Sequence, residues 1–222
     1  MKIGILGGIG PEATACLYSK LIGKLQASRK IKGNRDFPQI FINSIPAPEL
    51  LGESASEEEL LPYAEGLKEL DCFNPNFILM ACNTIHLFRE SLQAEVKAPI
   101  LDLREEVRER LVAEGVKSIA VLGTPMMVKG GLFKFAGVGY VAPSEEELAQ
   151  LSTAVFNFNK GERKEKQREV AKKIAERCLE QGAEKLVLGC TEIALMLREE
   201  GLASLDTMDV LADAACRRAL ER

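Results

Sequence analysis

Short apolar segments alternate along this chain with longer segments in which apolar and charged residues recur at helical spacing. That alternation is typical of an α/β protein in which helices connect parallel strands. The apolar segments show no polar face, which suits strands that helices cover on both sides. We expect strands at Lys2–Leu6, Gln39–Asn43, Asn76–Met80, Ser118–Leu122, Gly137–Val141 and Lys185–Leu188.

Capping boxes mark the start of two of the intervening helices. Ser56 is followed three residues later by Glu59, and Ser144 is followed in the same way by Glu147. In a capping box the serine side chain and the glutamate side chain each bond a backbone N–H of the other residue. We therefore expect helices to begin directly after Ser56 and Ser144.

The two halves of the sequence resemble each other. Lys2–Gly8 (KIGILGG) is similar to Ser118–Thr124 (SIAVLGT), and Asn76–Thr84 (NFILMACNT) is similar to Lys185–Glu192 (KLVLGCTE). All α/β proteins repeat themselves weakly, but that general likeness does not predict a cysteine at the same place in both halves. We interpret the halves as two related α/β units, each of about 100 residues, a common domain size.

The expected domains follow from this repeat. The first comprises residues 1–98 together with residues 208–222, because the last helix is expected to pack back on the first unit, and the second comprises residues 99–207. We expect two similar parallel-sheet domains that are related by pseudo-two-fold symmetry and have the active site at their interface. In open parallel sheets, ligand-binding residues lie just past the carboxyl ends of the strands.

Composition narrows the classes of function. The net charge of −4 gives no general attraction to nucleic acid or to an anionic membrane surface. No apolar run approaches the roughly 18–20 residues of a membrane span, and the N-terminus does not resemble a signal peptide. Six cysteines without an export signal predict reduced thiols in a cytoplasmic protein. Without a CxxC motif, and with a single histidine, no metal site is expected.

Cys82 and Cys190 are the strongest candidates for chemistry, since each follows a predicted strand directly. Asn83 and Thr84 follow the first cysteine, and Thr191 and Glu192 follow the second. We expect these residues to cap helices, so each sulfur is expected beside the free N–H groups of a helix start. That setting lowers the pKa of a thiol from its usual value of about 8.5. Two opposed thiols, one ionised and one protonated, would remove a proton from one face of an acidic carbon and deliver one to the other.

The other cysteines are expected to be structural. Cys16, Cys178 and Cys216 lie on predicted helices among apolar neighbours, where cysteine usually serves as a small buried hydrophobic residue. Cys72 lies at a helix end and is also expected to be inert.

Three segments together resemble the aspartate/glutamate racemase family: GGIGPEAT (Gly7–Thr14), ACNTIH (Ala81–His86) and LGCTEI (Leu188–Ile193). The resemblance runs from residue 3 to about residue 210. It implies an enzyme without pyridoxal phosphate or another cofactor, usually a homodimer, which racemises a small acidic amino acid. It also implies that the catalytic cysteines are Cys82 and Cys190. Residues implied to hold the carboxylate and amino groups of the substrate are Asn83, Thr84, Thr124 and Thr191.

Two further residues gain candidate roles from this resemblance. Lys160, in the segment NFNKGERK, is similar to a family lysine that meets the side-chain carboxylate; the alternative is a solvated lysine in a charged run. Glu192 has three open roles: a helix cap, a partner behind the site or a contact to the substrate amine.

The segment Gly8–Ala13 fits the outline of a dinucleotide-binding fingerprint, G-x-G-x-x-A. The next predicted strand runs into Asn43 and Ser44 instead of the acidic residue that would bind a ribose. We therefore prefer a loop whose backbone N–H groups, around Ile9, line the site of the substrate carboxylate. His86 is expected to pack or hydrogen-bond behind this site.

Two departures from the family pattern widen the choice of substrate. Thr124 is followed at the third position by Met127, where the family often has a second threonine. The segment SIPAPELL (Ser44–Leu51) contains Glu49 but lacks the arginine of aspartate-specific members. Aspartate and glutamate therefore both stay open. The alternatives are a related member that acts on a hydantoin, maleate or a malonate derivative, a non-catalytic amino-acid-binding protein, and a thiol-redox protein.

Overall fold

The computed structural model describes residues 1–48, 50, 52 and 54–221. Contacts divide the chain into two compact units, which are considered one at a time. Unit 1 consists of Met1–Glu49, Ala55–Leu103 and Met208–Arg222, and unit 2 consists of Leu50–Ser54 and Arg104–Thr207. Among the described residues, no helix is both long enough and apolar enough to cross a membrane.

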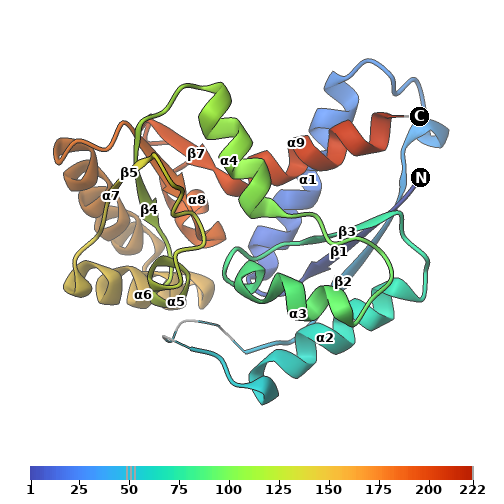
Figure 1. Cartoon of the computed structure of the whole chain (residues 1–222), viewed down its shortest axis with the longest axis horizontal. Coiled ribbons are helices and arrows are strands. Elements are labelled where there is room, and N and C mark those ends of the chain that lie inside the picture. Colours follow the sequence, from blue (N-terminus) through green and yellow to red (C-terminus); the bar gives the residue numbers. More distant parts are fainter. Residues whose placement is uncertain (49, 51, 53, 222) are drawn as a thin grey trace. The chain divides into compact units, whose positions relative to one another are not determined.

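Unit 1 is built on a parallel sheet with the strand order β2-β1-β3 (Figure 1). Its strands are β1 (Lys2–Gly7), β2 (Gln39–Ser44) and β3 (Phe77–Met80). A parallel bridge between Ile78 and Ile100 continues the sheet beyond β3. The central strand β1 is almost wholly buried, as its continuous apolar sequence predicts.

The helical segments of unit 1 connect and cover these strands. They are α1 (Pro11–Ala27), the 3-10 turn η1 (Asn34–Asp36), α2 (Glu57–Asp71), the 3-10 segment η2 (Thr84–Phe88), α3 (Arg89–Ala94) and α9 (Thr207–Leu220). The C-terminal helix α9 lies beside α1, where Lys24 forms ion pairs with Asp209 at 3.1 Å and with Asp213 at 2.7 Å (Figure 1). Helix α2 approaches the sheet closely, since a Cβ on Gly66 would lie 2.9 Å from side chains of Leu6 and Ile45.

Unit 2 is built on a second parallel sheet, with the strand order β5-β4-β6-β7. Its strands are β4 (Ser118–Leu122), β5 (Gly139–Val141), β6 (Lys185–Leu188) and β7 (Ser204–Asp206). Its helices are α4 (Leu103–Ala113), α5 (Pro125–Lys129), α6 (Glu145–Asn159), α7 (Lys164–Glu180) and α8 (Thr191–Leu197) (Figure 1).

The two sheets share one register. Ile3 of β1 pairs with Phe77 of β3, and Ile119 of β4 pairs in the same way with Lys185 of β6. The bridge from β3 to Ile100 has its counterpart in the pairing of β6 with β7. The expectation of two similar parallel-sheet α/β regions is thus confirmed, and the similarity extends to which residues lie opposite each other.

The predicted strands are close to the observed ones, with two differences at their starts. The strand expected from Gly137 begins at Gly139, because Gly137 has φ of 80°, a left-handed conformation outside the extended range of regular strands. The strand expected from Asn76 begins at Phe77, because the Asn76 side chain accepts a hydrogen bond from the Lys2 N–H at 2.7 Å.

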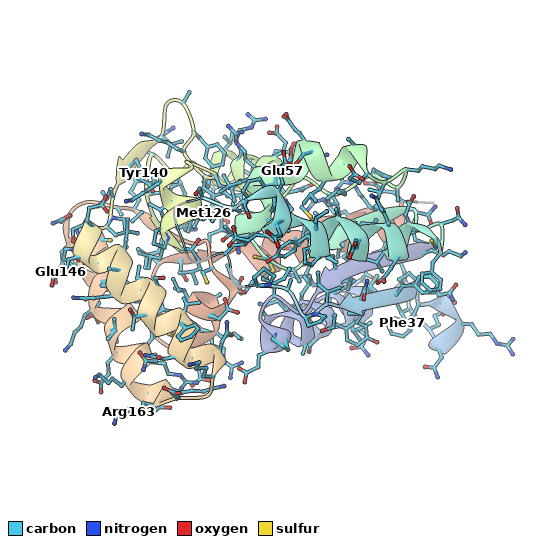
Figure 2. All side chains as sticks on the ribbon, turned by 90° about the horizontal axis from the view of Figure 1, so that it is seen from below. Phe37, Glu57, Met126, Tyr140, Glu146 and Arg163 are labelled. Atoms are coloured by element: carbon cyan, nitrogen blue, oxygen red, sulfur yellow. The ribbon has the colours of Figure 1, made fainter. Side chains whose placement is uncertain are left out.

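Both predicted capping boxes are confirmed. The Ser56 side chain accepts from the Glu59 N–H at the start of α2, and Ser144 accepts from Glu147 N–H at the start of α6, each at 3.2 Å. The acidic first turns of both helices face solvent, as Glu57 and Glu146 show (Figure 2). Negative charge there also favours the positive end of each helix dipole.

Candidate active site

Cys82 lies two residues past the end of β3 and is only 8% exposed. The next residue, Asn83, is 2% exposed. Neither the Nδ2 nor the Oδ1 atom of Asn83 has a hydrogen-bond partner among the described residues. A buried amide without partners is costly, on the order of 1–3 kcal/mol for each unmet group, so its presence beside the thiol suggests a place for a polar ligand.

The backbone after Cys82 differs from the predicted capped helix. Residues 84–88 form the 3-10 segment η2 before the short helix α3 begins at Arg89. Asn83 has helical backbone angles (φ −69°, ψ −46°), and its side chain makes no capping bond. A capping side chain needs an extended backbone at that residue. The prediction that Asn83 caps a helix is therefore wrong, and its amide stays available for another partner.

His86 lies behind the Cys82 segment and is fully buried there. Its Nε2 lies 3.4 Å from the Met80 carbonyl oxygen, while its Nδ1 has no partner among the described residues. Burial lowers the pKa of His86 to about 4, against the smaller opposing effect of the Met80 hydrogen bond. The imidazole is thus neutral at neutral pH, with the proton on Nε2 if that nitrogen donates to the carbonyl.

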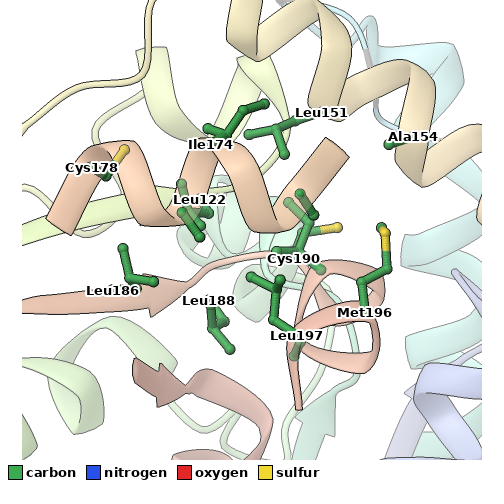
Figure 3. Packing of buried hydrophobic residues seen from close by; sticks show 14 of the residues in the cluster. Leu122, Leu151, Ala154, Ile174, Cys178, Leu186, Leu188, Cys190, Met196 and Leu197 are labelled. Carbon is green, nitrogen blue, oxygen red and sulfur yellow. The ribbon is translucent and has the colours of Figure 1, made fainter. Parts of the chain in front are cut away.

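Cys190 lies two residues past the end of β6, the same position that Cys82 has after β3. It is 6% exposed and belongs to an apolar cluster that includes Leu122, Leu188 and Leu197 (Figure 3). Helix α8 begins at the following residue, with Cys190 itself in the N-cap position. Thr191 therefore makes no cap, which differs from the prediction.

A carboxylate stands next to the Cys190 thiol. The Sγ–H donates to Oε2 of Glu192 at 3.0 Å, and the Thr191 hydroxyl donates to the same oxygen at 2.8 Å. Glu192 is itself only 5% exposed. Two neighbouring donors thus satisfy one buried carboxylate oxygen, as a buried charge requires.

The pKa of Cys190 is raised well above the usual value of a thiol. Burial is the largest cause, followed by the charge of Glu192 and by the hydrogen bond to it. The N–H groups of Ile193 and Glu192 act in the opposite direction, because they favour the thiolate. The expected helix-start donors are therefore present, but the prediction of a lowered pKa is wrong for this thiol, since burial and the carboxylate outweigh them.

The glycine-rich segment after β1 forms a closed turn. Gly8 and Gly10 have φ of 90° and 84°, and the Gly8 N–H donates to the Thr14 hydroxyl at 2.9 Å. A Cβ on Gly7 would lie 2.3 Å from the Thr14 methyl group, so only glycine fits there. Ile9, at the middle of the turn, is 8% exposed. Thr14 was not among the predicted functional residues, although it belongs to the GGIGPEAT segment.

Thr124 begins the short helix α5 in unit 2. Its hydroxyl accepts from the Met127 N–H at 3.3 Å, and Met127 is fully buried. The Met127 side chain fills the space beside Gly123 and Gly189, where an added Cβ would lie 1.8 Å and 2.5 Å from the methionine methyl carbon. In place of the second hydroxyl of the family pattern, the chain thus has an apolar group packed against the glycine that precedes Cys190.

Lys160 is exposed at the end of α6, where its ammonium group lies 4.2 Å from the centre of the Phe156 ring. Glu49, in the segment expected to lack a cation, lies outside the described residues. Thr207 was not among the predicted site residues. It is fully buried, and its hydroxyl donates to the Leu188 carbonyl at 2.9 Å, which supports the end of β6 just before Cys190.

The structure therefore brings Cys82, Asn83 and Thr84 together in unit 1, and Cys190, Thr191 and Glu192 together in unit 2. The remaining cysteines differ in setting: Cys178 and Cys216 are buried, Cys16 is partly buried and Cys72 is exposed. Within the described ranges, no group of three or more His, Cys, Asp or Glu side chains could hold a metal ion.

The fold and the site together define a class of protein. It is a parallel α/β protein of two units, with one cysteine at the equivalent strand end of each unit. Residues 6–215 match the family model described as Asp/Glu/Hydantoin racemase. The chain belongs to that family, whose named activities are racemisations and hence isomerase reactions.

Two solved structures are similar over the whole chain. An aspartate racemase homologue from Pyrococcus horikoshii OT3 is 26% identical, with 99% of each chain covered and a TM-score of 0.75. An aspartate racemase from Picrophilus torridus is 22% identical and shares the fold, with a TM-score of 0.79 over 100% of this chain and 95% of the other. The broad specificity amino-acid racemase RacX of Bacillus subtilis (strain 168) is 28% identical over 133 residues, which are 60% of this chain and 58% of that protein.

Proposed function

We propose that this protein is a cofactor-independent racemase of an acidic amino acid, aspartate or glutamate or both. It would act by a two-base 1,1-proton transfer in which Cys82 and Cys190 face opposite sides of the substrate α-carbon. The proposed domain limits are residues 1–98 with 208–222, and residues 99–207.

The equivalence of the two thiols is the observation that carries this proposal. Each cysteine comes five residues after the residue that pairs with an equivalent position of the central strand: Phe77 opposite Ile3, and Lys185 opposite Ile119. Unrelated buried cysteines have no reason to share one position in two sheets. A two-base racemisation needs an acid/base group on each face of the α-carbon, and two groups of the same kind can exchange the roles of acid and base when the reaction runs in the opposite direction.

In the proposed mechanism, one thiolate removes the α-proton and becomes a thiol. The electron pair left on the α-carbon is delocalised into the substrate carboxylate, and the opposite thiol then delivers its proton to the other face. Fixed donors around the carboxylate stabilise the charge that develops there. Asn83, whose buried amide has no partner within the described residues, is the first candidate for such a donor.

The other proposed substrate contacts come from both units. Thr84 and the Ile9 turn in unit 1, and Thr124 and Thr191 in unit 2, would hold the carboxylate and amino groups. Lys160 would meet the side-chain carboxylate, for which its exposed ammonium group would move from the Phe156 ring.

Two observations bear on the identity of the substrate. Met127 offers an apolar side chain where a hydroxyl is common in the family. RacX, which is described as a broad specificity amino-acid racemase, matches over part of its length. A related reaction on a hydantoin, maleate or a malonate derivative is the second candidate, since the family description includes hydantoin racemases. A non-catalytic amino-acid-binding protein is the third.

We also propose a homodimer that works in the cytoplasm on a small-molecule substrate, without a cofactor, a nucleic acid or a membrane as partner. The negative net charge supports the exclusion of nucleic acid and membrane partners, and the reduced state expected of the six cysteines supports the location. The homodimer is proposed from the family resemblance.

Proton exchange in D₂O tests the function directly. Each enantiomer of aspartate and of glutamate is incubated with the protein, α-proton loss is followed by NMR, and the products are separated on a chiral column. We expect α-proton exchange together with inversion for at least one of the two amino acids, aspartate or glutamate. If none of the four compounds shows exchange or inversion, the racemase proposal is wrong. Binding without exchange would favour the amino-acid-binding alternative.

Asn83→Ala tests the proposed carboxylate contact. A hydrogen bond to a charged group contributes about 1.5–3 kcal/mol, so substrate affinity should fall by roughly 10- to 150-fold. The melting temperature should be unchanged or raised, because the amide has no partner in the described structure to lose. Unchanged affinity for every substrate tested would exclude Asn83 from the binding site.

A further inference from the structure

We infer that Glu192 is a positioning residue that keeps Cys190 in the thiol form in the resting protein, so that Cys190 acts first as the proton donor. The part of this inference that concerns turnover rests on the proposed function. The part that concerns the state of the thiol does not, because it follows from groups within unit 2 alone.

The geometry places one proton between the sulfur and the carboxylate, because Cys190 Sγ and Glu192 Oε2 lie 3.0 Å apart. A thiol is ordinarily a weaker acid than a carboxylic acid, so the proton between them belongs to the sulfur. The second donor to that oxygen, the Thr191 hydroxyl at 2.8 Å, keeps the carboxylate turned toward the sulfur. The exposed fractions of 6% for Cys190 and 5% for Glu192 leave little water to screen a second negative charge.

Among the described residues, Glu192 is the charged side chain that acts on this sulfur. Helices α6 and α7, which pack against α8, contribute apolar residues to the cluster that contains Cys190, including Leu151, Ala154 and Ile174 (Figure 3). The other titratable member of that cluster is Cys178. Among the described groups that act on Cys190, only the backbone N–H groups of Ile193 and Glu192 favour its thiolate.

This arrangement has a consequence for the reaction. When Cys190 gives its proton to the carbanion of the substrate, its S–H bond breaks and a thiolate is left 3.0 Å from a carboxylate. Two buried negative charges at that distance repel each other strongly, so the state is short-lived and the sulfur recovers a proton readily. In the resting protein, the group ready to remove a proton is then Cys82. The enantiomer whose α-proton faces Cys82 should react in the first turnover, and the other must wait for the thiols to exchange roles.

The pH dependence of cysteine alkylation tests the state of Cys190 without any substrate. The protein is treated with iodoacetamide between pH 6 and pH 10, and the modification of each cysteine is followed by peptide mass spectrometry. The exposed Cys72 serves as the reference for the reactivity of iodoacetamide at each pH. The shape of each rate profile gives the apparent pKa, so the slow access of reagent to a buried sulfur does not affect the comparison.

We expect the rate at Cys190 to be still rising above pH 9 in the unaltered protein. Glu192→Gln keeps the size of the side chain and removes the charge, so the Cys190 profile should move to lower pH by about one to three pH units. Glu199→Gln, which removes a charge from an exposed side chain two residues past the end of α8, should leave the profile in place.

Two results would overturn the inference. One is a Cys190 midpoint at or below the ordinary thiol value of about 8.5 in the unaltered protein, which decides the matter even if Glu192→Gln does not fold. The other is a folded Glu192→Gln variant whose Cys190 profile does not move. Because no substrate is used, a raised and Glu192-dependent midpoint supports the inference even if the D₂O assay shows no racemisation.

If the racemase proposal holds, a single-turnover experiment adds a second measure. With protein in excess over each deuterated enantiomer in H₂O, we expect one enantiomer to lose its α-deuterium in a burst and the other to lag. Glu192→Gln should reduce the difference between their rates. Equal bursts for both enantiomers in the unaltered protein would contradict the assignment of Cys190 as the first donor.

Discussion

The ends of β3 and β6 are the same place in two sheets, yet they surround their cysteines differently. After Cys82 the chain continues as a 3-10 segment, and the buried amide of Asn83 has no partner within the described residues. After Cys190 an α-helix starts at once, and a buried carboxylate takes hydrogen bonds from the thiol and from Thr191. Buried polar atoms after β3 thus have no hydrogen-bond partner within the described residues, whereas those after β6 form hydrogen bonds with one another.

The comparison shows that a shared strand register does not imply shared chemistry. The register places both sulfurs, but the side chains one and two residues later decide what each sulfur can do. Asn83 and Thr84 in unit 1 correspond to Thr191 and Glu192 in unit 2. A neutral amide can receive a ligand, whereas a carboxylate changes the protonation of its neighbour.

The largest expected effect is the loss of activity on removing either thiol. Cys82→Ser and Cys190→Ser should each lower the rate of racemisation by about 10²- to 10⁴-fold, the contribution of a positioned acid/base group. Cys190→Ser should still exchange deuterium into the enantiomer that Cys82 reaches, whereas Cys82→Ser should exchange the other enantiomer more slowly, because Cys190 rests as a thiol. Chiral chromatography and NMR in D₂O measure both effects.

Cys178→Ala is the control for this pair, because Cys178 is a buried cysteine of the same apolar cluster as Cys190. The Cys178→Ala variant should have a lower free energy of unfolding and an unchanged rate of racemisation. Normal racemisation by either serine variant would exclude the two-thiol mechanism.

A matched pair of core leucines tests whether the two units are stabilised independently. Leu6 and Leu122 hold equivalent positions in the central strands, opposite Met80 and Leu188, and both are fully buried. Leu6→Ala and Leu122→Ala should each lower the free energy of unfolding by about 2–5 kcal/mol, because each leaves a cavity. Hydrogen exchange should accelerate mainly within the unit that carries the substitution. The same exchange pattern in both variants would contradict the division into two units.

Acid should weaken unit 1 through a group that unit 2 lacks. The position equivalent to His86 is occupied in unit 2 by Ala194, another buried residue. The folded-state pKa of His86, about 4, is below the ordinary value of 6.5, so the unfolded chain binds a proton that the folded chain does not between these pH values. Stability from this group is complete above pH 6.5 and is lost as the pH falls toward 4, in total about 3 kcal/mol.

His86→Gln removes this titration. Denaturant unfolding between pH 7 and pH 4 should show a smaller loss of stability for His86→Gln than for the unaltered protein. Parallel curves for the two proteins over that range would show that His86 is not buried in its neutral form.

The smallest expected effects concern the two capping boxes. Ser56→Ala and Ser144→Ala should each lower the free energy of unfolding by about 0.5–2 kcal/mol, because each leaves a helix-start N–H without its acceptor. If the two variants lose free energies of unfolding that differ by more than about 1.5 kcal/mol, the width of that range, the two similar helix starts depend on different contacts. Thermal unfolding of both variants provides the measurement.

Much of the fold and part of the site could be predicted because the information is local. Apolar runs such as Ser118–Leu122 form strands wherever helices can cover them, and Ser56 with Glu59 closes a box within three residues. The repeated position of Cys82 and Cys190 could also be predicted, since a register follows from spacing along the chain. The predictions that failed, namely capping by Asn83 and by Thr191 and a lowered pKa at Cys190, concern side-chain surroundings.

The sequence by itself determined the class of fold, the repeat and the matched positions of Cys82 and Cys190, because these depend on periodicity and on residue type. Only the tertiary structure decided what each cysteine faces. The backbone angles at Asn83 turned its amide away from capping, and the burial of Glu192 against Cys190 reversed the expected shift of that thiol. Burial and dihedral angles depend on segments far apart in the chain, such as Thr207 beneath the end of β6, so spacing alone cannot reveal them.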